Sequence, residues 1–177
     1  SYTSFEYSGM ELSARQMGDQ ESLEVSCTIT NTGSRAGSEI VQIYVSALHP
    51  GVFRPVQELK GFGKVLLDPG EAKQVSFKLS KRAFAFYNTA INDWSVETGD
   101  YAILIGASSR DIRLRDTIRF ESEVEVRILD YRSIAPGYYD LSGGLNVSDE
   151  EFTALLGRLI PARERNQHVD DCLGRRV

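Results

Sequence analysis

The first two thirds of the chain consist of short runs in which apolar and polar residues alternate. Residues 22–30 place Leu23, Val25, Cys27 and Ile29 at every second position, with Ser, Glu and Thr between them. Alternation with a period of two is typical of a strand that buries one face and leaves the other in water. The pattern therefore predicts β-structure in this part of the chain.

Turn-forming residues separate these runs. The segment N-T-G-S-R-A-G at 31–37 supplies two glycines for positive φ, and D-P-G-E at 68–71 lies between two apolar runs in the manner of a β-hairpin. Further strands are expected around Val41, Ile43 and Val45, around Val75, Phe77 and Leu79, around Tyr101, Ile103 and Ile105, and from Ile112 and Leu114 onward. Short strands between turns, with almost no helical periodicity, favour an all-β antiparallel sandwich. Because the Cys…Trp…Cys spacing of true immunoglobulin domains is absent, we predict a fibronectin type III-like (immunoglobulin-like) sandwich over residues 1–121.

Residues 122–177 change character and predict an extension of the sandwich. The alternating run E-V-E-V-R-I at 123–128 predicts an edge strand, and a Gly- and Tyr-rich loop follows it. The run S-D-E-E at 148–151 is a capping-box signature with apolar residues at helical spacing behind it. It predicts one short helix over about 149–159, which Pro161 ends. The polar residues beyond predict a mobile tail.

Composition and charge narrow the possible partners. A net charge of −5 without a compensating basic stripe argues against nucleic acid. No apolar run approaches the roughly 20 residues of a membrane-spanning helix, so no membrane partner is expected. Cys27 and Cys172 do not form a disulfide framework; Cys27 is predicted to be a buried thiol, and unpaired thiols favour a cytoplasmic location. Since the chain opens on Ser1 inside a strand-like run, we expect it to be a segment of a longer protein.

Residues with metal-binding or redox chemistry are sparse. His49 and His168 are the only histidines, and neither has a second ligand beside it at metal spacing. The sequence therefore predicts no metal site and no cofactor.

Five motifs occur in order along the predicted sandwich. They are S-Y-T-S-F-E-Y at 1–7, N-T-G-S-R-A-G-S-E-I-V-Q-I-Y-V at 31–45, R-P-V-Q-E-L-K-G-F at 54–62, W-S-V-E-T-G-D-Y at 94–101 and G-A-S-S-R-D-I at 106–112. Together they resemble the C-terminal fibronectin type III-like domain of family 3 glycoside hydrolases, the β-glucosidase and β-xylosidase group. The segment at 148–161 is similar to an extension that follows this domain in some bacterial members.

The resemblance implies a division of labour within a larger enzyme. In the family, the nucleophile is an Asp on a (β/α)₈ barrel and the acid/base is usually on a second α/β domain, so no catalytic residue is expected in this chain. Retaining hydrolysis needs two carboxyl groups roughly 5 Å apart, and no pattern here selects such a pair. The triplet at 92–94 is similar to the family's nucleophile-bearing S-D-W run, but it precedes a sandwich motif. We therefore predict that Trp94 is a buried packing anchor and Asp93 a turn residue.

The loop from Ala47 to Gln57 is the predicted functional surface. It is long for a sandwich connection, and it carries an Arg-Pro pair that core packing does not explain. By the resemblance, this side of the domain lies against the catalytic domains. The expected docking residues are Phe53, Arg54, Pro55, Glu58 and Lys60. We expect the Arg54 guanidinium to meet a carboxylate or backbone carbonyls across that interface.

Three functions stay open at this point. The first is an accessory domain of a β-glucosidase-type enzyme, which packs on the catalytic domains of the same chain and stabilises them. The second is an independent carbohydrate-binding module. Four aromatic residues could stack on an oligosaccharide: Tyr44, Phe53, Tyr138 and Tyr139. Tyr44 is expected to pack between strands and the loop aromatics to hold the tail; if the chain does bind sugar, Tyr138 and Tyr139 are the candidate contacts. The third is a stand-alone protein-binding sandwich.

Overall fold

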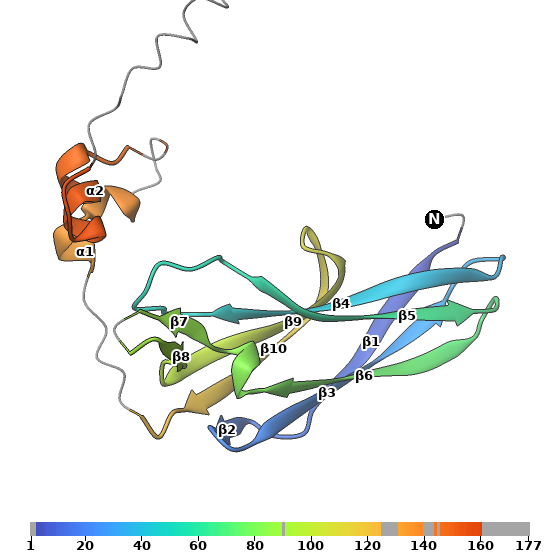
Figure 1. Ribbon diagram of the computed structural model, residues 1–177. Coiled ribbons are helices and arrows are strands. Elements are labelled where there is room, and N and C mark those ends of the chain that lie inside the picture. The colour runs from blue at the N-terminus through green and yellow to red at the C-terminus, as the bar shows by residue number, and fades with distance from the viewer. Residues whose placement is uncertain (1–2, 90, 125–130, 140–143, 145, 161–177) are drawn as a thin grey trace, which may run out of the picture. The chain divides into compact units, whose positions relative to one another are not determined.

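The computed structural model describes residues 3–89, 91–124, 131–139, 144 and 146–160 of the 177-residue chain (Figure 1). Two compact units separate, Ser1–Ile128 and Leu129–Val177, and each is described by itself. The domain boundary between residues 121 and 122 stays a prediction.

The first unit is a β-sandwich, which confirms the predicted all-β fold (Figure 1). One sheet has the order β1 (Phe5–Leu12), β3 (Ser22–Asn31), β6 (Ala72–Ser80). The other has the order β2 (Gln16–Gly18), β10 (Asp111–Glu121), β9 (Gly99–Ser108), β4 (Gly37–Ala47), β5 (Glu58–Leu67). Their strand pairs are antiparallel except β2 with β10, which is parallel. The N-terminal segment therefore contributes one strand to each sheet, and β5 lies at an edge.

The alternating residues of both sheets meet in one core. In β3, Leu23, Val25, Cys27 and Ile29 are all fully buried, as the sequence predicts. The Cys27 thiol is unpaired, and burial raises its pKa to about 11. A small thiol in this position packs as an apolar group and is poorly ionised.

Three aromatic rings fill one part of the core. Phe84 follows β6, and its ring centroid lies 5.3 Å from that of Tyr101 on β9 and 5.3 Å from that of Phe120 on β10. All three side chains are at most 1% exposed. Edge-to-face and tilted contacts of this kind add to the stabilisation from burial, so this trio fixes how the connection after β6 meets the second sheet.

A small hairpin departs from the prediction made for Trp94. A short 3₁₀ helix, η1 (Lys81–Ala83), precedes β7 (Phe86–Asn88) and β8 (Asp93–Ser95), which pair only with each other. Trp94 is 39% exposed, so the prediction of a buried anchor is wrong, and Asp93 begins the strand instead of forming a turn. The alternation of β8 turns Ser95 inward and Trp94 outward, where its ring contacts Tyr87 edge-on and the Arg82 guanidinium.

The second unit contains α1 (Tyr131–Ile134), a 3₁₀ turn η2 (Pro136–Tyr138) and α2 (Asp149–Leu156). The capping box forms as predicted: the Ser148 hydroxyl accepts the Glu151 N–H at 3.1 Å, and the Glu151 carboxylate accepts the Ser148 N–H at 3.0 Å. The predicted end of this helix is wrong. It stops at Leu156 because Gly157 adopts a left-handed conformation with φ of 67°. The predicted tail lies outside the described residues, as does the predicted edge strand apart from residues 123 and 124.

Truncation of the aromatic trio tests this account of the core. We expect Phe84→Ala to lower the free energy of unfolding by about 3–5 kcal/mol, because it removes a fully buried ring and leaves a cavity. The matched control is Phe62→Ala on β5, where the ring is 71% exposed and the expected loss in this chain is about 0.5 kcal/mol. Urea denaturation measures both values, and equal losses would contradict the assignment of the core.

Candidate interdomain docking site

The predicted docking residues occupy the loop between β4 and β5 and the first three residues of β5. Phe53 is 59% exposed, and Pro55 is also exposed. The Arg54 side chain between them is only 5% exposed. The loop therefore presents one aromatic and one proline ring to solvent while its arginine turns into the domain.

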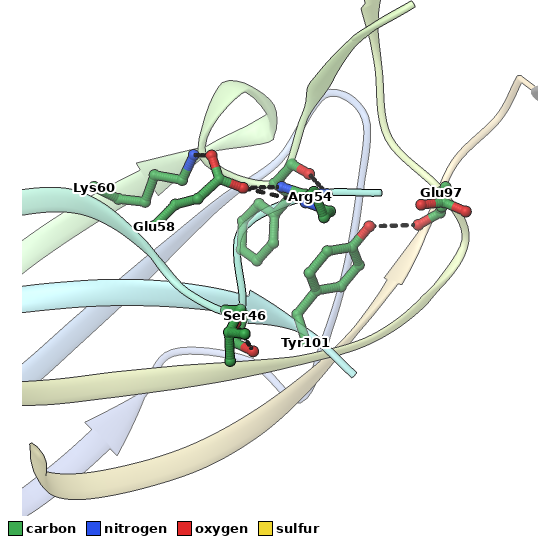
Figure 2. A network of polar contacts seen from close by, with 8 residues as sticks. Ser46, Arg54, Glu58, Lys60, Glu97 and Tyr101 are labelled. Carbon is green, nitrogen blue, oxygen red and sulfur yellow. Dashed lines mark hydrogen bonds and ion pairs between the residues drawn. The ribbon is translucent and has the colours of Figure 1, made fainter. Parts of the chain in front are cut away.

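The Arg54 guanidinium is bound from inside the domain (Figure 2). Its Nε and Nη2 both donate to Oε1 of Glu58, at 3.1 and 2.5 Å, and its Nη1 donates to the backbone carbonyl oxygen of Phe84 at 3.1 Å. The sequence predicted a carboxylate and carbonyls as partners of this arginine, but across an interface. Those partners belong to the same domain, so Arg54 stabilises the loop by binding it to the start of β5 and to the backbone at Phe84. The docking role of the whole residue set stays a prediction.

Glu58 lies between two cations. Besides Arg54, the Lys60 Nζ donates to its Oε2 at 2.9 Å, and the Lys60 side chain is 14% exposed. Burial raises the pKa of the Glu58 carboxyl, but the hydrogen bonds from Arg54 and Lys60 outweigh it, and the net pKa lies below its usual value of 4.5. A general acid needs a raised pKa, so this carboxylate is suited to holding structure.

Further hydrogen bonds hold the rest of the loop. The Gly51 N–H donates to the Glu97 carboxylate at 2.8 Å. The Tyr101 hydroxyl donates to the Glu97 carbonyl at 2.9 Å (Figure 2). Burial raises the pKa of Tyr101 to about 12, which keeps it a neutral donor. At the far end, the Ser46 hydroxyl donates to the Val56 carbonyl at 2.5 Å. The loop has no regular secondary structure, yet hydrogen bonds fix both of its ends.

One more side-chain hydrogen bond holds the end of this loop that leads into β5. The Gln57 side-chain amide donates to the Ser109 carbonyl of the β9–β10 turn at 2.6 Å.

Tyr44 lies on the outer face of the five-stranded sheet with Ala102 and Leu104, and it is only 5% exposed. Its hydroxyl donates to Gln42, so Tyr44 packs between strands as expected and offers no ring to a sugar.

The two candidate carbohydrate contacts belong to the second unit. Tyr138 ends η2 and Tyr139 follows it, and both are half-buried. The Arg132 guanidinium lies 5.3 Å from the centroid of the Tyr139 ring, so a cation already uses this aromatic surface. Contact with an oligosaccharide stays a prediction.

The described residues lack two features, a cluster of metal ligands and a membrane-spanning helix. No group of three His, Cys, Asp or Glu residues there is placed to hold a metal ion. Nor does any helix among these residues have the length and apolarity to cross a membrane.

The sequence pattern alone did not identify several residues that contact this loop. Glu97 and the Phe84 carbonyl lie more than 25 positions from Arg54 in the chain, and no local pattern marks them as its neighbours. The exposed apolar residues of β5 were missed as well, although a signal exists. In E-L-K-G-F-G-K-V-L-L, Gly61 and Gly63 occupy alternate positions, and Phe62 and Leu66 lie on the opposite face.

Comparison with known proteins gives a consistent result. Residues 39–109 match the family described as "Fibronectin type III-like domain". The chain is 52% identical over 127 residues to thermostable β-glucosidase B of Acetivibrio thermocellus, covering 72% of this chain and 17% of that protein. It is 42% identical over 123 residues to an exo-α-(1→6)-L-arabinopyranosidase of Bifidobacterium breve, covering 70% of this chain and 16% of that protein.

A solved structure shows the same relation. The crystal structure of a GH3 β-glucosidase from Bifidobacterium adolescentis matches with a TM-score of 0.66 and 34% identity, over 74% of this chain and 20% of that one. The chain thus spans about one sixth of the length of the curated relatives that it matches.

Replacement of Arg54 tests whether it is an internal support. We expect Arg54→Ala to lower the free energy of unfolding of this chain by about 2–4 kcal/mol, because Glu58 and the Phe84 carbonyl lose their donor in a largely buried site. The control is Arg113→Ala, whose ion pair with Asp111 is about half exposed and should contribute less than about 1 kcal/mol. If urea denaturation gives the same small loss for both variants, the Arg54 assignment is wrong.

The lowered pKa of Glu58 predicts a pH dependence. In the unfolded chain this carboxyl has its usual pKa of 4.5, and in the folded chain its pKa is lower. The ionised group therefore stabilises the fold above pH 4.5, and this stabilisation is lost as the pH falls through the folded pKa. We expect the wild-type chain to lose more stability than Glu58→Gln between about pH 7 and about pH 3 in urea denaturation. Parallel losses in the two proteins would count against it.

Proposed function

Because this chain carries the fibronectin type III-like domain of family 3 glycoside hydrolases, we propose that it is a non-catalytic accessory domain. It packs on the catalytic domains of the same polypeptide and stabilises them. In this proposal the polypeptide as a whole hydrolyses terminal β-D-glycosidic bonds, and the reacting carboxyl groups lie outside these 177 residues.

One observation carries the proposal: the domain accounts for only 17% and 16% of two hydrolases that it resembles along most of its own length. The site supports it. Arg54, Glu58 and Lys60 form hydrogen bonds that hold a loop in one conformation. A loop held in this way can present Phe53 and Pro55 to a neighbouring domain at low entropic cost. Interfaces between domains of one chain, typically about 600–1,500 Å², are large enough to fix their relative geometry.

The sugar preference is proposed to reside elsewhere in the polypeptide. Two relatives that match this domain about equally along its length are described as a β-glucosidase and an arabinopyranosidase. Similar accessory domains thus accompany different substrate specificities.

Two measurements test the accessory role. The purified chain should release no p-nitrophenol from p-nitrophenyl β-D-glucoside above the buffer rate, and it should show no calorimetric affinity for cello-oligosaccharides. Deletion of residues 1–121 from the full-length hydrolase should lower its melting temperature and its retained activity after heating, because the catalytic domains lose a packing partner.

Enzyme-like turnover by the chain alone would overturn the proposal. Sugar affinity of the chain that is lost in a Tyr138→Ala/Tyr139→Ala variant would favour a carbohydrate-binding module instead. A full-length enzyme that is equally stable without the domain would remove the proposed function altogether.

A further inference from the structure

Four large apolar side chains are exposed together on the outer face of the five-stranded sheet. Ile40 of β4 is 46% exposed, and the three on β5, Leu59, Phe62 and Leu66, are 51%, 71% and 62% exposed. The strand register places them on one side. Leu59 pairs with Tyr44, Phe62 with Gln42 and Leu66 with Ser38, all of which alternate with the inward-facing Val41, Ile43 and Val45. We call these four residues the β5 face.

The β5 face results from an inversion of the usual pattern of an edge strand. Antiparallel strands with one solvated side normally place polar residues outward. In β5 the inward positions include Gly61 and Gly63, where an added Cβ would lie 3.2 Å from Ile43 and 3.5 Å from Val75. Glycines therefore occupy the inner side in the first half of β5, with Val65 and Leu67 facing the core farther along, while Phe62 and Leu66 point outward. Four large apolar side chains exposed on one face of two neighbouring strands, with Lys64 among them, are typical of an interaction site with an apolar and a charged component.

The strand edge itself is protected from pairing with another strand. The register shifts between Ile43 and Tyr44, which introduces an irregularity opposite the start of β5. Lys60 and Lys64 also lie along β5. Irregularities and lysines on an edge strand disfavour sheet-to-sheet addition of a second molecule. These features act against strand addition at the edge, whereas Leu59, Phe62 and Leu66 point away from the edge to the outer face, so a partner that packs onto the face fits better than one that extends the sheet.

The cationic residues on this face argue against self-association. They favour a partner surface with carboxylates around an apolar centre. Lys64 pairs with Ile40 in the register, and Arg115 pairs with Leu104, so both lie on the outer face. Both side chains are exposed, and no ion pair joins either of them to another described residue. A second copy of the chain would bring the same cationic residues, whereas a surface with an apolar centre and carboxylates around it would complement them.

We propose that the β5 face is the surface through which this domain docks on the hydrolase domains of its own polypeptide. This inference rests on the proposed function and adds to it the face, the side chains and the chemistry of the partner surface. The Arg54 network contributes from behind. Glu58 and Lys60 flank Leu59 in sequence, and the bonds that Glu58 accepts from Arg54 and from Lys60 fix the start of β5 while Leu59 projects outward.

The test uses the full-length hydrolase with Phe62→Ser/Leu66→Ser. A matched control is Ile91→Ser, which removes an apolar side chain that is 56% exposed on the β7–β8 hairpin. Cleavage by a protease at the junction before the domain reports the undocked population. Truncation of large side chains at an interface centre commonly weakens association about tenfold or more. We therefore expect cleavage of the double variant to be at least about tenfold faster than cleavage of the control.

Measurements on this chain alone separate docking from folding. Phe62 and Leu66 are largely exposed here, so the double variant should keep the urea midpoint of the wild-type chain. If domain deletion destabilises the full-length enzyme but the double variant is cleaved like the control, the β5 face is not the docking surface, and the accessory function survives. If neither change has an effect, both proposals fail. If the isolated chain dimerises and the double variant is monomeric, the occupant is a second copy and the inference is overturned.

Discussion

The burial of the Arg54 guanidinium is the interaction on which the arrangement of this domain depends. Removing a cation from water costs several kcal/mol, and only partners with good geometry recover that cost. Here a carboxylate of β5 and the carbonyl of Phe84 supply them. These partners come from segments far apart in the chain, so the loop, the start of β5 and the connection after β6 must be in place together.

The apolar character of β5 follows from a second constraint. On the inner side of the strand, a Cβ at Gly61 would lie 3.2 Å from Ile43 and 3.5 Å from Phe77, and one at Gly63 would lie 3.5 Å from Val75, so a larger side chain at either position would require its neighbours to shift. Two large apolar side chains of the same strand, Phe62 and Leu66, point outward instead. In the proposed accessory role, the outward side chains become stabilising once a neighbouring domain removes them from water. The same residues contribute little to the isolated domain, and we expect them to matter in the longer polypeptide proposed above.

The sequence was sufficient for features that short-range patterns determine. Alternation located the strands, as in β3, and the Ser148 capping box located the start of α2. It was insufficient where local patterns compete. Gly157 ends α2 before Pro161 is reached, because a left-handed glycine satisfies the helix end by itself. Trp94 was assigned by size to the core, but strand alternation placed Ser95 inward.

For the candidate site, the sequence identified a residue but not the residues that it contacts. The sequence singled out Arg54 and its type of partner, yet it could not show that Glu58 and Phe84 of the same domain supply that partner. Glu58 lies only four residues from Arg54, but Phe84 lies 30 residues away, and no spacing rule encodes that contact. The exposed face of β5 could have been found from its alternating glycines, provided that the inner side of the strand was known.

Amide hydrogen exchange of this chain alone and within the longer polypeptide that we propose tests the central claim most directly. The account predicts that peptides from residues 37–47 and 58–67, which form β4 and β5, exchange more slowly in the longer polypeptide. Peptides from β3 and β6 should exchange at the same rate in both. Equal exchange of the β4 and β5 peptides in the two proteins would contradict the claim that this domain docks through that face.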